Sequence, residues 1–130
     1  MQRIADTGLI VAALDRLDRH HTWAAQQLEE FAPFHTCEAV LVEVSYLLDD
    51  PLPGLRLVLR GDLLLNFSLD AHKARVLELL EKYSRMDLAD GCLVKMSEMV
   101  DRCQIWTVDR SDFTIYRRHG RQTIPCAFPP

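Results

Sequence analysis

Four acidic residues lie far apart in this chain at positions where a fold could bring their side chains together, namely Asp6, Glu43, Asp90 and Asp109. Asp6 and Asp109 each follow a short run typical of a β-strand, so both should emerge at the carboxyl edge of a parallel sheet. Glu43 falls on the same face of a predicted helix as Val40 and Leu47, and no Lys or Arg lies within one turn of it. A buried carboxylate without a cation is costly, and a metal ion is one way to remove that cost.

Converging carboxylates have a limited range of chemistry. Like charges a few ångströms apart either share protons or bind a divalent cation, and Mg²⁺ and Mn²⁺ prefer hard oxygen ligands of this kind. Such a cation lowers the pKa of water and stabilises the charge that develops on a phosphodiester. The four acids therefore predict metal-assisted phosphodiester hydrolysis, with Mg²⁺ or Mn²⁺ as the cofactor. Each acid taken alone also has a structural interpretation, as a helix cap or a solvated residue.

The structural interpretation is strongest for Asp87 and Asp90. Asp87 at the start of a predicted helix, with Asp90 three residues later, forms a carboxylate version of the capping box, which the helix dipole favours without any chemistry. We predict that Asp87 is the N-cap. For Asp90 a capping role and a site role both remain open, because a carboxylate at a helix N-terminus can also face the strand ends.

The elements that must position these acids alternate along the chain between short apolar strands and helices. Strands are expected at 3–5, 34–36, 63–67, 104–108 and, as an edge strand bounded by prolines, 123–128; helices are expected at 9–14, 22–31, 37–48, 55–59, 69–83 and 88–103. Thr36, Ser68 and Asp87 are the predicted N-caps of the helices that follow them, and 50–54 is a predicted loop. Such alternation predicts an α/β fold with a parallel sheet and helices on both of its faces.

Composition predicts one globular domain covering residues 1–130. The 130 residues are 48% hydrophobic and 26% charged, and they contain no repeat or Gly/Ser linker. The net charge of −4, from 15 basic and 19 acidic residues, argues against a protein that coats nucleic acid by bulk electrostatics. With no apolar run long enough to span a bilayer and no secretory signal, we expect a cytoplasmic protein with no membrane contact and four reduced cysteines.

The C-terminal stretch concentrates basic residues. Arg110, Arg117, Arg118 and Arg121 lie within twelve residues that contain a single acid, Asp112. Two interpretations stay open, a basic strip that holds a phosphate backbone and a solvated tail. Tyr116 lies beside two of these arginines, so the candidate contacts to a nucleic acid are Arg110, Tyr116, Arg117 and Arg118.

Four motifs occur in order along nearly the whole chain: IADTG at 4–8, EAVLVEV at 38–44, MDLADGCLV at 86–94 and TVDRSDF at 107–113. Together they resemble the motifs of the PIN-domain ribonucleases, and most closely those of VapC-type toxins of toxin–antitoxin modules. Each motif alone is weak, but four at family-like spacing are fairly specific. Gly91 departs from the commoner pattern, in which Ala often follows the third acid.

The resemblance implies a three-layer α/β/α sandwich around a short parallel sheet, a Mg²⁺ or Mn²⁺ site and endonucleolytic cleavage of RNA. Carried over by position, Asp6, Glu43 and Asp90 are the first three acids, and the fourth lies within 109–112. We favour Asp109 over Asp112 because Asp109 follows the strand directly. The expected supporting residues are Thr7, Thr107, Asp87 and Asp112. A toxin role, homodimerisation and a cognate antitoxin protein are expectations of the same resemblance.

Three other interpretations compete with nuclease activity. Asp-Thr-Gly is also the signature of aspartic proteases, but their fold is all-β and this chain predicts several helices. A phosphoacceptor domain would need a Lys at a strand end, and the lysines at 73, 82 and 95 all fall in predicted helices. The remaining alternative is a PIN-like domain that binds RNA or a protein partner without significant turnover.

Overall fold

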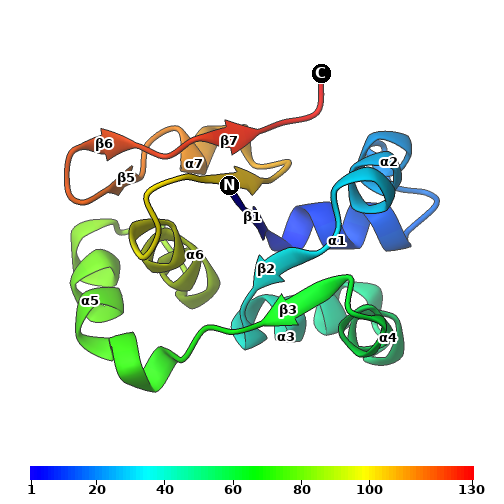
Figure 1. Cartoon of the computed structure of the whole chain (residues 1–130), viewed down its shortest axis with the longest axis horizontal. Helices are drawn as coiled ribbons and strands as arrows, with labels where there is room; N and C mark the ends of the chain where they lie inside the picture. Colours follow the sequence, from blue (N-terminus) through cyan, green and yellow to red (C-terminus); the bar gives the residue numbers. More distant parts are fainter.

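A five-stranded parallel sheet forms the centre of the computed structural model, which describes residues 1–130 (Figure 1). The strands are β1 (Gln2–Ala5), β2 (Phe34–Thr36), β3 (Leu63–Leu65), β4 (Cys103–Trp106) and β7 (Cys126–Ala127). Their order across the sheet is β3-β2-β1-β4-β7, and every neighbouring pair is parallel. The predicted parallel sheet is confirmed, and so is an edge strand near the C-terminal end.

Seven helices and a small hairpin complete the fold. The helices are α1 (Thr7–Leu14), α2 (His21–Phe31), α3 (Glu38–Leu48), α4 (Leu52–Arg60), α5 (Leu69–Lys82), α6 (Leu88–Glu98) and α7 (Arg110–Phe113). In Figure 1, α5 and α6 lie on one side of the sheet and α1 and α2 on the other, which gives the three layers of an α/β/α sandwich. The hairpin pairs β5 (Arg117–Arg118) with β6 (Gln122–Thr123). The single edge strand predicted over 123–128 is therefore divided, with its start in this hairpin and β7 in the main sheet.

The two strands at the centre of the sheet carry apolar residues on both faces, as expected for a sheet covered by helices on both sides. Ile4 of β1 pairs in register with Ile105 of β4, and Ala5 pairs with Trp106. All four side chains are buried in a core cluster of 27 residues. The packed core therefore fixes the ends of these two strands, and with them the positions of Asp6 after β1 and Thr107 after β4.

Several predicted boundaries were wrong. Thr36 does not cap α3: it ends β2, and its hydroxyl donates to the carbonyl of Ala5 at 2.8 Å, so it ties two strands together. The helix expected over 88–103 ends at Glu98, and Cys103 begins β4. A turn after residue 98 is needed because the chain must reverse to add a strand beside β1. The predicted caps Ser68 and Asp87 are confirmed, since each accepts a backbone N–H of its helix.

The predicted loop at 50–54 was also partly wrong, because α4 begins at Leu52 and includes Pro53 and Gly54. Proline is tolerated in the first turn of a helix, where its missing N–H has no intrahelical acceptor. A Cβ on Gly54 would lie 3.0 Å from Cδ1 of Leu41, so glycine lets α4 pack closely on α3. Composition suggested a loop here, but tertiary packing selects a helix.

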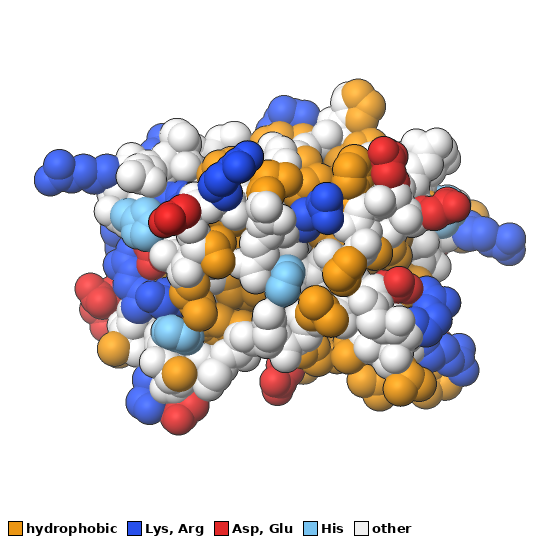
Figure 2. All heavy atoms as spheres, in the orientation of Figure 1, with side chains coloured by type: hydrophobic (Ala, Val, Ile, Leu, Met, Phe, Trp, Pro, Cys, Tyr) orange, Lys and Arg blue, Asp and Glu red, His pale blue; other side chains and the backbone are white.

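Apolar side chains also reach the surface. Figure 2 shows such side chains gathered over α4, where Leu52, Leu55 and Leu59 are 52%, 55% and 87% exposed. Acidic and basic side chains are interspersed over the rest of this face. None of the helices combines the length and the apolar character needed to cross a membrane.

Candidate active site

Six acidic residues of the chain lie together at the edge of the sheet, at the point where the strand order reverses direction. From β1 the chain moves outward to β2 and β3, and it later returns to place β4 on the other side of β1. The crevice between β1 and β4 is thus a topological switch point, the usual ligand site of open parallel sheets. Asp6 follows β1 directly and Asp109 lies just beyond β4, so both flank this crevice.

Asp6 is buried and held at both oxygens. Its Oδ1 accepts the backbone N–H of Thr7 at 2.7 Å, and its Oδ2 accepts the hydroxyl of Thr107 at 2.7 Å. Burial nevertheless raises the pKa of this carboxyl to about 6, because the two hydrogen bonds do not replace the lost hydration and the charges of Asp109 and Glu43 raise the pKa further. The Asp6 carboxylate would thus gain from a cation.

Glu43 reaches the same place from α3. The Thr7 hydroxyl donates to its Oε1 at 2.6 Å, which links the helix to the end of β1. Burial, together with the charge of Asp87 nearby, raises the pKa of Glu43. The Thr7 residue therefore contacts two acids, one through its backbone and one through its side chain.

Asp90 lies in the first turn of α6, whose N-cap is Asp87. Asp87 accepts the backbone N–H of Asp90 at 2.8 Å, as the capping interpretation predicts. The Asp90 carboxylate does not point to solvent: it is 9% exposed, and its Oδ2 accepts the phenol of Tyr116 at 2.9 Å. Burial, and then the charges of Asp6 and Asp87, raise the pKa of Asp90 to about 8.

Asp109 and Asp112 both face the crevice from α7. Asp109 is the N-cap of this short helix, and its Oδ1 accepts the backbone N–H of Asp112 at 3.0 Å and the hydroxyl of Ser111 at 3.2 Å. Oδ1 of Asp112 is buried without a hydrogen bond of good geometry, although Nη2 of Arg85 lies 3.1 Å from it. Burial and the neighbouring Asp109 raise the pKa of Asp112.

These side chains line one cavity of about 650 Å³. Its acidic lining residues are Asp6, Glu43, Asp87, Asp90, Asp109 and Asp112, and Arg85 is the single Lys or Arg among the lining residues. The helices α1 and α6 begin here, with Asp6 and Asp87 as their N-caps, so the positive ends of two helix dipoles face the acids. The dipoles reduce the repulsion among the carboxylates, yet four of the six still have raised pKa values.

The donor set of this cavity fits a hard divalent cation. All the acidic donors are carboxylate oxygens, which Mg²⁺ and Mn²⁺ prefer, and one of them, Asp112 Oδ1, is buried without a hydrogen bond. No three of the acidic, His or Cys side chains stand close enough to surround an ion as they are placed. A closed protein shell is not required, because Mg²⁺ keeps several waters and binds proteins through one or two carboxylates.

Gly8 allows α1 to pass close to the segment that follows β4. A Cβ at this position would lie 2.3 Å from Cγ2 of Val108, closer than any real contact of this kind. The first turn of α1 thus passes directly over the segment that follows β4, which brings Asp6 and Thr107 within hydrogen-bond distance. The glycine of the Asp-Thr-Gly run is explained by this close approach.

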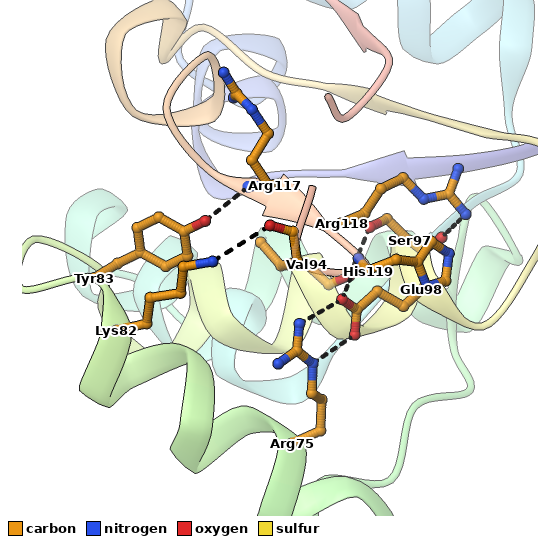
Figure 3. A network of polar contacts seen from close by, with 10 residues as sticks. Arg75, Lys82, Tyr83, Val94, Ser97, Glu98, Arg117, Arg118 and His119 are labelled. Carbon is orange, nitrogen blue, oxygen red and sulfur yellow. Dashed lines mark hydrogen bonds and ion pairs between the residues drawn. The ribbon is translucent and has the colours of Figure 1, made fainter. Parts of the chain in front are cut away.

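Part of the predicted RNA-contact set was wrong, because two of its members are buried. Tyr116 is 1% exposed and bonds to Asp90, and Arg118 is 5% exposed. The Arg118 guanidinium donates to the carbonyl of Ser97 in the last turn of α6 (Figure 3). It also donates to the carbonyl of Val100 just beyond the helix, so it satisfies carbonyls that the helix leaves unpaired. The sequence around Tyr116 and Arg118 gives no indication that the two side chains are buried.

The other two predicted contacts lie nearer the surface but outside the cavity. Arg117 donates to the carbonyls of Thr114, Ile115 and Tyr116. The exposed Arg110 stacks on the ring of Phe128, 4.4 Å from its centroid. Sequence reasoning missed Arg85, which lines the cavity: it lies outside the basic stretch and stands alone in sequence.

A model of the PIN domain family matches residues 3–116 of the chain. PIN domains are generally nucleases and typically use divalent metal ions, in keeping with the chemistry of the cavity. No curated protein matches the chain significantly.

Proposed function

The chain belongs to the PIN domain family, and from that premise we propose that it is an endoribonuclease dependent on Mg²⁺ or Mn²⁺. The observation that carries the proposal is the convergence of six carboxylates on one cavity at the switch point of the sheet, four of them with raised pKa values. A purely structural acid cluster would be a standing cost to the fold. A bound cation would offset that cost by neutralising the carboxylates, and it would also allow a phosphodiester substrate to bind beside them. We propose that residues 1–130 act as one domain in the cytoplasm.

The residues that would hold the cation are Asp6, Glu43, Asp90 and Asp109. When bound, a divalent ion supplies positive charge that lowers the pKa of water and offsets negative charge on the phosphodiester. The same carboxylates repel phosphate when no cation is present, so the cavity should accept RNA only in the loaded state.

The rest of the chain orients the carboxylates and holds protons. Thr7 and Thr107 fix the oxygens of Asp6 and Glu43, which limits the ways in which these side chains can rotate. In the cation-free chain the proton of Asp90 belongs on Oδ1, because Oδ2 already accepts the Tyr116 hydroxyl. When a cation binds, this pKa would fall and Asp90 would release the proton, so Asp90 would serve the loaded site as a carboxylate ligand.

We further propose that the protein is the toxin component of a toxin–antitoxin pair and forms a homodimer. An exposed apolar face beside the cavity supports a protein partner: Val42 and Tyr46 of α3 are 68% and 82% exposed, and Leu55 and Leu59 of α4 are also exposed. Exposed apolar patches of this kind mark interaction sites in soluble proteins. Analytical ultracentrifugation of the purified chain, with Leu59→Glu as the comparison, tests whether this face joins two copies.

The nuclease proposal is tested by RNA cleavage with purified wild-type protein and the Asp6→Asn variant. Both are assayed with Mn²⁺ and again with excess chelator. Cleavage that requires both the cation and Asp6 supports the proposal, because a contaminating ribonuclease would not depend on residue 6. If both proteins bind RNA and neither cleaves any member of a varied panel, the docking alternative replaces the nuclease.

A further inference from the structure

Arg85 stands alone as a cation in an acidic cavity. Among the lining residues it faces six carboxylates, and no Lys or other Arg is present to share that role. It lies in the turn between α5 and α6, two residues before the Asp87 cap. The next residue, Met86, is 8% exposed and packs into the core, so the backbone at Arg85 is anchored while the side chain extends into the cavity mouth.

The one ion pair of Arg85 is loose. Its Nη2 lies 3.1 Å from Oδ1 of Asp112, but the arginine side chain is 66% exposed and that oxygen has no hydrogen bond of good geometry. The Arg75–Glu98 pair at the far end of α6 is different (Figure 3). There the guanidinium donates two hydrogen bonds, at 2.9 Å and 2.7 Å, and the carboxylate is 5% exposed. Arg75 is held by its partner, whereas Arg85 is free to leave.

We propose that Arg85 binds a phosphate of the RNA strand, exchanging Asp112 for phosphate oxygens when substrate enters the cavity. This inference rests on the proposed function. It identifies Arg85 as the residue whose positive charge offsets the repulsion between RNA phosphates and the acidic cavity. A guanidinium presents a fork of donors that matches two phosphate oxygens, and an exposed ion pair is easily given up in exchange. The departing arginine also frees Oδ1 of Asp112 beside the cation-binding acids.

RNA binding without turnover tests the proposal. Fluorescence anisotropy of a labelled single-stranded RNA is measured with Ca²⁺ in place of Mg²⁺, since Ca²⁺ takes the same oxygen donors with a longer, looser geometry; a gel confirms that the RNA stays intact. The variants are Arg85→Ala and Arg85→Lys. Arg60→Ala is the matched control, because Arg60 is 64% exposed, pairs with Asp62 at 2.8 Å and does not line the cavity.

Removing one phosphate contact should weaken binding about tenfold at low salt and reduce the slope of log affinity against log salt by about 0.7, the value for one phosphate on a single strand. Arg85→Lys should keep most of the slope, because it keeps the charge, while losing part of the affinity. Arg60→Ala should match wild type. Mn²⁺ affinity, measured by calorimetry, should be unchanged or tighter in Arg85→Ala, because a competing cation has been removed.

Three results would overturn the proposal. Equal RNA affinity and salt slope in wild type and Arg85→Ala exclude the contact and leave the nuclease proposal intact. Weaker Mn²⁺ binding with an unchanged slope would show instead that Arg85 positions the Asp112 carboxylate for the cation. Absence of any RNA binding or cleavage by wild type overturns the proposed function itself, and the role of Arg85 with it.

Discussion

The phenol of Tyr116 donates to Oδ2 of Asp90 across a distance of 2.9 Å, which joins the segment after α7 to the first turn of α6. The Tyr116 ring is held by two edge-on aromatic contacts, with centroids 5.2 Å from Tyr83 and 5.3 Å from Phe113. Because the ring cannot move freely, the hydroxyl fixes the direction of the carboxylate. Tyr116 is thus a positioning residue for an acid of the candidate site.

Tyr116→Phe should shift the pH dependence of cleavage upward. The hydrogen bond favours the charged form of Asp90 and lowers its pKa, so its loss raises that pKa further above about 8. The acidic limb of the pH–rate profile should move to higher pH, while the free energy of unfolding falls by only about 1 kcal/mol. Tyr83→Phe is the control, since its hydroxyl accepts the backbone N–H of Arg117 and does not contact Asp90. Identical profiles for the two variants would contradict the positioning role.

Asp90→Asn should stabilise the cation-free protein in alkaline solution. Folding raises the Asp90 pKa from an ordinary 3.8 to about 8, so the folded state holds the proton more tightly and its stability falls as pH rises between these values. The variant has no carboxyl to titrate at this position, so its free energy of unfolding should exceed that of wild type by several kcal/mol at pH 9 and lose that advantage near pH 4. Thermal melts of both proteins between pH 4 and pH 9 measure whether the variant becomes the more stable of the two as pH rises. Asp70→Asn changes a side chain that is 91% exposed, so its stability relative to wild type should not vary with pH in this way. Added Mn²⁺ should reduce the stability difference between Asp90→Asn and wild type.

Gly8→Ala should destabilise the fold by about 1–3 kcal/mol through overpacking against Val108. The added methyl group must push α1 away from the segment after β4, which also lengthens the contact between Thr107 and Asp6. Val108→Ala in the same chain removes the clashing methyl groups and should restore most of the loss. Chemical denaturation of the single and double variants measures this coupling, and purely additive effects would show that the two residues do not meet.

Asp109→Asn and Asp112→Asn separate the two candidates for the fourth acid. If Asp109 holds the cation, its variant should lose cleavage by about 10²-fold or more, and Asp112→Asn should lose less. Ser111→Ala is the control for local structure. It removes a hydroxyl that donates to Asp109 but keeps the hydrogen bond from the backbone N–H of Asp112 to Asp109. The reverse order of effects would assign the role to Asp112.

Much of the architecture could be predicted from the sequence because its signals are local. The apolar runs that end at Asp6 and near Asp109 marked strands, and Asp87 marked the start of a helix that the structure contains. These signals depend on propensity and spacing within a few residues. The gathering of the acids also followed, since parallel strands end at a common edge.

The failures concern contacts between distant segments. Thr36 is a good capping residue by type, yet its hydroxyl bonds to Ala5 across the sheet. Tyr116 and Arg118 are polar side chains in a basic stretch, but one meets Asp90 and the other the end of α6, partners that only the three-dimensional fold provides. Arg85 was missed for the same reason, because its significance comes from the acids around it.

The position of β1 has a consequence for how the molecule is made. The strand that comes first in chain order, β1, is the middle strand of the sheet, and its Gln2 pairs with Cys103, about a hundred residues further along the chain. Contacts of such sequence separation slow folding. A nascent chain that ends before β4 has Asp6, Glu43 and Asp90 but lacks Thr107 and the acids of α7. The acidic cavity is completed only by the residues that follow β4, so a chain that ends before them cannot form it.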